Sequence, residues 1–221
     1  MNTAFKHIVA RTYKPLLVKY LAKTRTYRYQ DIRLFVPPEV FHPGFFFSTQ
    51  FLLEYVNKLP LQGKQLLELG CGSGLISIAA AKKGALVTAS DINPVAVEAL
   101  KKNSRNNNAP LTVIGSDLFD DIPVKQFDII AINPPFYKKQ PATAKDHAWY
   151  CGENGEYFSK LFASLREYIH KHAEILMVLI DDCDMEMING YAAANGFSLR
   201  CVQDKKNMLE QLFIYTIKRD V

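Results

Sequence analysis

The chain of 221 residues is 48% apolar and 22% charged, which is typical of a folded domain and excludes a largely disordered protein. It has no apolar run of ~18 residues, the length that spans a bilayer, and residues 1–5 lack the apolar core of a signal peptide. We therefore expect a cytoplasmic protein with no membrane partner.

The net charge of +5 is concentrated at the N-terminus. Residues 1–33 contain eight Lys or Arg and one acid, a net charge of +7, whereas the rest of the chain carries −2. A basic segment on a nearly neutral body favours a polyanionic partner such as structured RNA or the ribosome. The alternative is that these charges form only the solvated face of a helix whose tyrosines pack on the body.

We predict neither a metal site nor a disulfide, and we favour a monomer. The four cysteines are far apart and form no C-x-x-C pair: Cys71, Cys151, Cys183 and Cys201. His170 and His172 are near neighbours, but two residues at i and i+2 point to different sides of a helix.

The first predicted element is a basic amphipathic helix over 12–24, where apolar side chains recur at helical spacing. A strand is predicted over 32–36, ending at a Pro-Pro pair, and a helix over 47–58. We assign 1–46 to a basic N-terminal segment that covers the mouth of the sheet, and 47–221 to the main domain.

From residue 65 onward, short strand-like runs alternate with amphipathic helices. Strands are predicted over 65–69, 86–90, 111–114, 127–132, 173–180, 197–203 and 212–218. Helices are predicted over 75–83, 94–107, 154–170 and 185–195, with Pro94 at a helix start and Gly84 and Gly196 at helix ends. This pattern predicts an α/β fold, a doubly wound, Rossmann-like sheet of seven mostly parallel strands. The last two strands have no helix between them, which favours an antiparallel edge.

The segment 68–74, Glu-Leu-Gly-Cys-Gly-Ser-Gly, lies between a predicted strand and a predicted helix. Closely spaced glycines there let the backbone approach a nucleotide-like ligand. A dinucleotide fingerprint would need a small residue at position 75, where this chain has Leu75. Asp91 ends the next strand, where its carboxylate can accept two ribose hydroxyls, or it could instead cap the helix that begins near Pro94.

Asn133-Pro134-Pro135-Phe136 follows the strand over 127–132, at the edge where open α/β sheets place their sites. The Asn133 side-chain carbonyl and the Pro134 backbone carbonyl can accept the two N–H groups of a planar amine. The prolines stiffen the loop, and Phe136 can stack on a flat substrate. These four residues are the predicted catalytic group. The alternative is that Asn-Pro-Pro is only a tight turn.

The acid and glycines of 68–74 resemble the first motif of class I S-adenosylmethionine-dependent methyltransferases. This resemblance implies that the loop holds the methionine and ribose parts of the cofactor, and that Asp117 and Leu118 contact the adenine. Asp117 could instead only cap a turn. The cofactor-binding residues that we predict are Thr49, Glu68, Gly70, Cys71, Gly72, Gly74, Asp91, Ile92, Asp117, Leu118 and Asn133.

From Val40 onward the chain resembles the HemK-like branch of N-methyltransferases, which modify the glutamine amide of polypeptide release factors. The segments 40–43 and 48–54, with Thr49 as a polar contact, are similar to the family's cofactor-covering segment. The segment 148–155 looks like the one that shapes the family's acceptor pocket, although it could be a plain loop. This resemblance implies a methyltransferase whose protein substrate is a release factor.

Two departures leave the acceptor open. The family usually has Tyr where this chain has Phe136, and a longer helical N-terminal domain. Asn-Pro-Pro-Phe also occurs in enzymes that methylate guanine or adenine amino groups in ribosomal or transfer RNA, and a basic segment suits RNA. A third possibility, a binding module or a nicotinamide-dependent oxidoreductase, rests on the generic nucleotide-binding layout alone.

Overall fold

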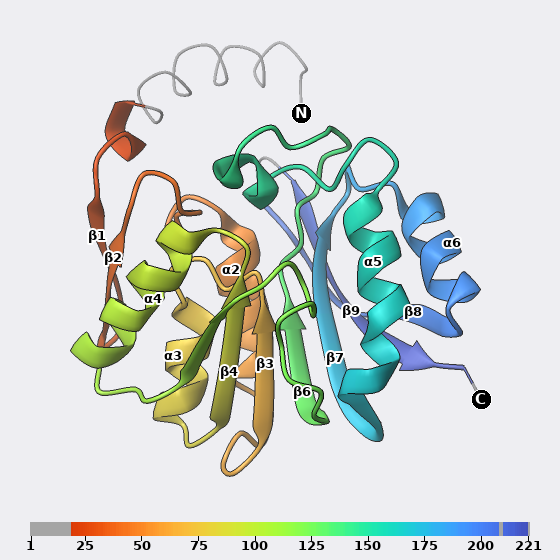
Figure 1. Cartoon of the computed structure of the whole chain (residues 1–221), viewed down its shortest axis with the longest axis horizontal. Coiled ribbons are helices and arrows are strands. Elements are labelled where there is room, and N and C mark those ends of the chain that lie inside the picture. The colour runs from red at the N-terminus through yellow and green to blue at the C-terminus, as the bar shows by residue number, and fades with distance from the viewer. Residues whose placement is uncertain (1–18, 208–209, 221) are drawn as a thin grey trace.

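A seven-stranded sheet runs through the centre of the protein in the computed structural model, which describes residues 19–207 and 210–220 (Figure 1). The strands are β3 (Gln65–Leu69), β4 (Leu86–Asp91), β5 (Thr112–Gly115), β6 (Phe127–Ile132), β7 (Ile169–Ile180), β8 (Phe197–Lys206) and β9 (Gln211–Arg219). Their spatial order is β5-β4-β3-β6-β7-β9-β8. Strands β3 to β7 run parallel, and β9 pairs antiparallel with both β7 and β8. The predicted mixed α/β sheet with an antiparallel edge is confirmed.

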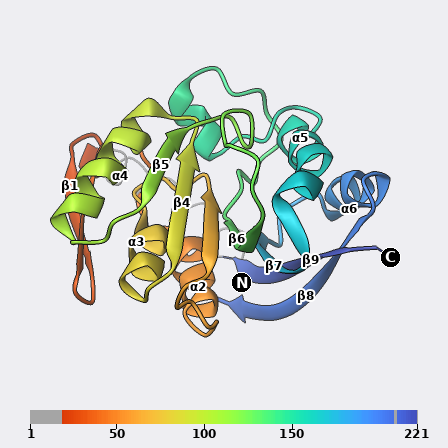
Figure 2. The same ribbon diagram turned by 60° about the horizontal axis from the view of Figure 1, so that its bottom comes forward.

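Helices cover both faces of this sheet (Figure 2). One face carries α2 (Phe47–Val56), α3 (Leu75–Lys82) and α4 (Pro94–Asn106), and the other carries α5 (Glu156–Leu165) and α6 (Met185–Ala194). Leu67 of β3 and Ile130 of β6 are fully buried, because central parallel strands are apolar on both faces. The carboxyl ends of β3, β4 and β6 therefore meet at one edge of a rigid core.

The helix boundaries follow the predicted start and stop signals. Asn93 is the N-cap of α4, its side chain accepts a hydrogen bond from the Val95 backbone N–H, and Pro94 takes the first helical position. Gly84 and Gly196, shortly after α3 and α6, have φ angles of 84° and 74°, in the left-handed region that ends helices.

The helix predicted over 154–170 is wrong at both ends. Gly155, with φ 74°, precedes the first turn of α5, and α5 ends at Leu165 in a single 3-10 turn, η2 (Arg166–Tyr168). Ile169 then pairs with Phe127 of β6, so the chain has already entered β7. His170 and His172 consequently lie on a strand, with ring centroids 6.4 Å apart, and not on two sides of a helix.

A two-stranded hairpin precedes the main sheet. It is formed by β1 (Arg25–Tyr29), which the sequence reading missed, and β2 (Ile32–Val36). The inner residues of β2 are buried, and β2 packs against α3 and α4, so the hairpin lies on the flank of the molecule and not over the pocket (Figures 1 and 2). The helix predicted over 12–24 falls mostly outside the described residues, although residues 19–21 are helical.

Within the described part of the chain, no helix is long and apolar enough to cross a membrane, and no three His, Cys, Asp or Glu side chains cluster as metal ligands would. All four cysteines are free, with Cys201 exposed and the other three buried.

Candidate functional site

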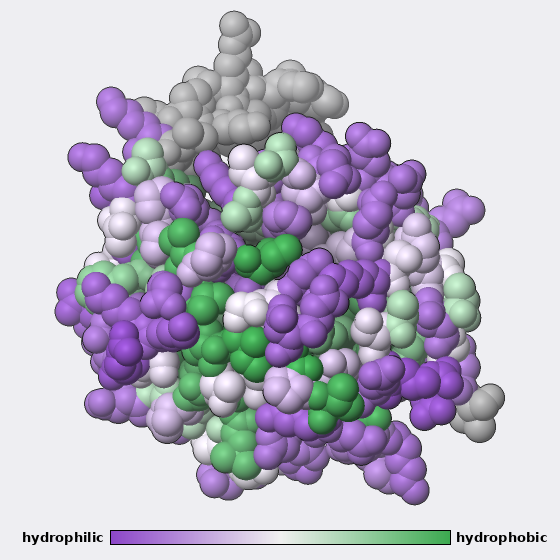
Figure 3. All heavy atoms as spheres, viewed as in Figure 1, coloured by the Kyte–Doolittle hydropathy of each residue, from purple (hydrophilic) through white to green (hydrophobic). Residues whose placement is uncertain are grey.

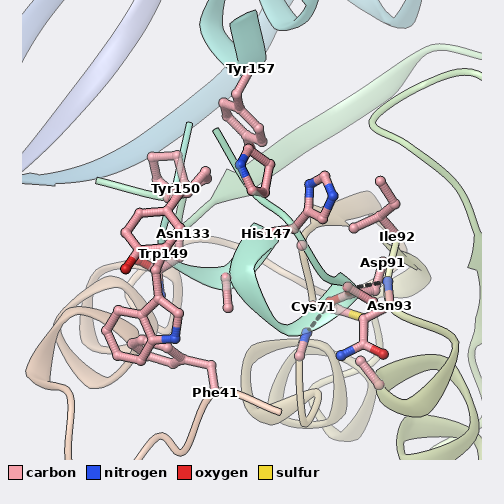
Figure 4. A pocket seen from close by; sticks show the side chains of 18 of the residues that line it. Phe41, Cys71, Asp91, Ile92, Asn93, Asn133, His147, Trp149, Tyr150 and Tyr157 are labelled. Atoms are coloured by element: carbon pink, nitrogen blue, oxygen red, sulfur yellow. Dashed lines mark hydrogen bonds between the residues drawn. The ribbon is translucent and has the colours of Figure 1, made fainter. Parts of the chain in front are cut away.

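A cavity of about 260 Å³ opens at the carboxyl ends of β3, β4 and β6 (Figure 4). Its wall includes thirteen residues singled out from the sequence: Thr49, Glu68, Gly70, Cys71, Gly72, Asp91, Ile92, Asp117, Leu118, Asn133, Pro134, Pro135 and Phe136. The structure thus brings together residues that are up to 87 positions apart, from Thr49 to Phe136. Gly74 is the one predicted residue that is absent from this described wall.

The glycine loop leaves β3 in a conformation that favours glycine. Gly70 and Gly72 have φ angles of 71° and 52°, and a Cβ added at Gly70 would meet no described atom within 4 Å. Gly74 has a different role, because it is the N-cap of α3 and a Cβ there would collide with the side chain of Leu100. The loop therefore presents bare backbone to the cavity, and Gly74 allows α3 to pack closely on α4.

Asp91 lies at the end of β4 with both carboxylate oxygens oriented. One accepts the Gly72 N–H at 2.8 Å and the other accepts the Asn93 N–H at 2.9 Å. Burial raises the pKa of Asp91, and these two backbone hydrogen bonds oppose the increase. Asn93, and not Asp91, caps α4, so the alternative role for Asp91 is excluded. Each oxygen keeps a lone pair that can accept a hydroxyl.

Glu68 lies deeper in the wall. Its Oε2 accepts hydrogen bonds from the backbone N–H and the side-chain hydroxyl of Ser77, at the start of α3. Burial raises the pKa of Glu68 to about 8, against the effect of the Ser77 bonds. The side chain therefore ties the glycine loop's strand to α3, and its burial favours the protonated form.

Asp117 and Leu118 follow β5 rather than ending it. The Asp117 carboxylate lies 2.5 Å from Nζ of Lys160 on α5, which also lies 2.6 Å from Asp120. Leu118 is buried and has φ 54°, which is uncommon for a residue other than glycine. The described partner of the Asp117 carboxylate is thus Lys160, and contact with adenine stays a prediction.

Asn133 follows β6 directly, and Thr49 of α2 fixes its side chain. Nδ2 of Asn133 donates to the Thr49 hydroxyl at 3.1 Å. The other end of the amide, Oδ1, is buried and has no hydrogen-bond partner among the described residues. A buried carbonyl without a donor carries a free-energy cost. Asn133 therefore lines the cavity with a side-chain amide that Thr49 holds at its nitrogen and whose buried oxygen is unpaired among the described residues.

The tetrapeptide continues into a loop that returns beside it. Tyr137 donates its N–H to the carbonyl of Trp149 and accepts from the N–H of Cys151, both at 2.9 Å. The intervening chain forms a 3-10 helix, η1 (Ala144–Ala148), which carries His147. These backbone bonds fix the loop over 137–152 relative to the tetrapeptide.

An aromatic cluster closes one side of the pocket. Phe41, Phe46 and Trp149 have ring centroids 4.3 to 5.1 Å apart, so the chain before α2 packs on the loop after β6. Figure 4 shows Phe41, Trp149 and Tyr150 on one side of the pocket, opposite Asp91. The cavity thus has a polar backbone half and an aromatic half.

The sequence predictions did not include several residues of this wall. Among them are Asn93, His147, Tyr157 and Lys160. The Pro94 helix start could have identified Asn93 as a cap. His147, Tyr157 and Lys160 lie on η1 and α5, and only the return of these elements to the pocket reveals them.

Comparison with known proteins shows the family. Residues 32–188 match the model of the methyltransferase small domain. The chain is 42% identical, over 108 residues, to a protein of Methanocaldococcus jannaschii that is provisionally named a protein N5-glutamine methyltransferase. That match covers 48% of this chain and 52% of the relative.

Two further proteins are similar. Ribosomal RNA small subunit methyltransferase C of Actinobacillus pleuropneumoniae is 35% identical over 116 residues, covering 51% of this chain and 35% of that relative. The matches thus span about half or less of these curated relatives. The structure of the E. cuniculi Mtq2-Trm112 complex, responsible for methylation of the eRF1 translation termination factor, superposes with a TM-score of 0.63. The identity there is 17%, over 82% of this chain and 99% of that one.

The Mtq2 likeness shows the fold, and the family match covers the residues that build the pocket. The chain belongs to the methyltransferase small domain family, whose model spans residues 32–188.

Proposed function

We propose that this protein transfers the methyl group of S-adenosylmethionine to a planar nitrogen, the side-chain amide of a glutamine in a protein. The observation that carries the proposal is the state of Asn133. Its amide nitrogen is occupied by Thr49, and its carbonyl oxygen is buried without a described partner beside the cavity. Such an acceptor fits a substrate that brings its own N–H donor into the pocket.

The polar half of the pocket fits the cofactor. The backbone of Gly70 and Gly72 would lie against its methionine part, and Asp91 would accept the two ribose hydroxyls. Ile92 and Leu118 would flank the adenine. When bound, the cofactor supplies a methyl group on a positively charged sulfur, which is electrophilic without further activation.

The Asp117 carboxylate is not free for the adenine contact that the family resemblance implies. Lys160 already holds its carboxylate, so an adenine amino group would have to share the carboxylate with that ammonium. We propose that Lys160 orients Asp117 at this end of the pocket.

The protein's own residues would orient the acceptor. An amide nitrogen is a poor nucleophile because its lone pair is delocalised into the carbonyl. Asn133 Oδ1 would accept one N–H of the acceptor and the Pro134 backbone carbonyl the other, which holds the nitrogen in place for in-line transfer. Pro135 limits movement of this loop, and Phe136 would pack on the flat acceptor.

A glutamine amide is favoured over an RNA base by the 42% identity to the protein provisionally named a glutamine methyltransferase. We propose a release factor as the protein substrate, because the Mtq2-Trm112 complex acts on one. The second candidate, a guanine or adenine amino group of RNA, is favoured by the ribosomal RNA relative and by the basic first 33 residues. A cytoplasmic location and a monomeric state stay predictions.

The test is a transfer assay with cofactor labelled in its methyl group. The purified protein is incubated with extract from cells that lack it, and the products are divided between protease and ribonuclease digestion. Purified release factor and ribosomal RNA are assayed in parallel. We expect the label in the extract to be released by protease. We also expect purified release factor to become labelled. Label released only by ribonuclease would overturn the protein acceptor and support the RNA candidate.

A further inference from the structure

The outer face of the β1–β2 hairpin places two arginines opposite each other. Arg28 of β1 and Arg33 of β2 are direct cross-strand partners, and both are exposed. Opposite residues of antiparallel strands have Cβ atoms about 5 Å apart, where like charges destabilise the pair. Arg28 Nε donates to the Gln30 carbonyl at 3.0 Å, a bond that a neutral donor could also make, so the hairpin does not require two positive charges here.

The hairpin is held rigidly on α4. Asn107 accepts the Arg33 N–H at 2.9 Å and donates to the Arg33 carbonyl at 2.8 Å. Asn103, one helical turn earlier, makes the same pair of bonds with the backbone of Phe35, at 2.8 and 3.1 Å. The spacing of the two asparagines on the helix matches the spacing of Arg33 and Phe35 on the strand. Four helical residues rise ~6 Å, and two strand residues rise ~6.7 Å. The two asparagines thus occupy the free edge of β2.

This junction brings a third cation to the same face. Nζ of Lys102 lies 4.9 Å from the centroid of the Phe35 ring, and Phe35 shares the outer face of β2 with Arg33. We call Arg28, Arg33 and Lys102 the basic ridge. Arg105 lies one turn further along α4 from Lys102 and is also exposed. Figure 3 shows hydrophilic residues gathered on this flank of the molecule.

The ridge and its surroundings hold more bases than acids, and the Asp31 carboxylate near Arg28 is paired with Lys82. Residues 25–36 and α4 together contain six Arg or Lys and two acids, a net charge of +4. Both acids are engaged elsewhere, Asp31 with Lys82 and Glu98 with Lys101, each at 2.7 Å. Among the described residues, no carboxylate lies within 4.0 Å of a charged nitrogen of the basic ridge.

We propose that the basic ridge is a docking surface for the phosphate backbone of RNA. Nucleic acid carries negative charge far more densely than a protein surface does, so it can relieve repulsion between two adjacent arginines. Guanidinium groups also match phosphate oxygens in geometry. The chain leads from β2 through residues 37–38 to the pocket wall at Glu39 and Val40. RNA bound to the ridge would therefore lie on the same flank as the pocket wall at Glu39 and Val40. This holds whether the pocket methylates a protein or an RNA.

The test compares Arg28→Gln/Arg33→Gln with a matched control, Lys171→Gln/Arg200→Gln, in the full chain. The control removes two exposed charges from β7 and β8 on the far part of the sheet. Binding of a fluorescein-labelled RNA hairpin is measured by anisotropy over a range of salt concentrations. We expect the ridge variant to bind more weakly and the slope of log K against log salt to fall by about two, one for each lost phosphate contact. The control should leave this slope unchanged.

Two results would overturn the proposal. One is an equal loss in both variants, which would indicate diffuse attraction. The other is full competition by a polyglutamate peptide at the same charge concentration, which would indicate an acidic protein partner. The ridge variant should melt close to wild type, because the lost repulsion offsets the loss of the Arg28 bond to Gln30, and should bind S-adenosylmethionine normally. The RNA-docking proposal and the proposed glutamine methylation can therefore be refuted independently of each other.

Discussion

The two halves of the pocket are built in different ways. The polar half, which would hold the cofactor and is called the cofactor half below, is made from adjacent strands and their backbone groups. Asp91 accepts hydrogen bonds from the N–H groups of Gly72 and Asn93, within a short stretch of chain. The acceptor half depends on contacts between distant segments, such as Phe41 with Trp149 and Thr49 with Asn133. A local motif can therefore specify what the first half binds, whereas packing between separate segments shapes the second.

The largest expected effect is on the acceptor half. Asn133→Ala should lower kcat by ~10²–10³-fold, the scale of removing one preorganised hydrogen-bonding group from a reacting centre. Cofactor affinity should change only a few fold, since the unpaired oxygen serves the acceptor. Turnover and calorimetric cofactor binding are measured on the same preparation. Normal turnover would remove Asn133 from the mechanism.

The next effect is on the cofactor half. Asp91→Ala should weaken cofactor binding by about 1.5–3 kcal/mol, the scale of hydrogen bonds to a charged group. The control is Asp121→Ala, which removes an exposed carboxylate outside the pocket wall. If both variants bound the cofactor equally well, the ribose contact would be wrong.

Thr49 distinguishes between the two halves. Thr49→Val keeps the shape of the side chain but removes the acceptor for Asn133 Nδ2, so kcat should fall by up to ~10-fold, the net value of one hydrogen bond. Thr49→Ser should restore it. If Thr49 instead serves mainly as a cofactor contact, as the family resemblance implies, Thr49→Val would raise the cofactor's KM and leave kcat unchanged.

The last effect concerns Glu68 and acts on stability and not on turnover. Its pKa is about 8 in the folded protein and near 4.3 in an unfolded chain. Between these values the folded state binds the extra proton, so Glu68 makes the protein less stable as the pH rises from about 4.3 to 8. Glu68→Gln keeps an acceptor for Ser77 and should reduce this decline. Urea unfolding at several pH values measures it, and an unchanged decline would mean that Glu68 is ionised.

The same division explains what could be predicted from the sequence. Alternating apolar runs and glycine or proline stops located β3, β6 and most helix ends, because those signals are local. The prediction that the helix continues to residue 170 was wrong, because Ile169 already pairs as a strand residue with Phe127, which is distant in sequence. Strand β1 was not predicted because its basic composition hides the strand pattern, and only its pairing with β2 makes it a strand. His147 and Lys160 reach the pocket only through tertiary packing.

The most direct test of the central claim is the chemical position of the transferred methyl group. Labelled product from the transfer assay is isolated and hydrolysed in acid, the hydrolysate is made alkaline, and the volatile amine is collected. A methylated glutamine amide should yield glutamate and labelled methylamine, and tandem mass spectrometry should place the methyl group on one glutamine side chain. Label recovered as methanol after mild base, or as a methylated nucleoside, would contradict the account.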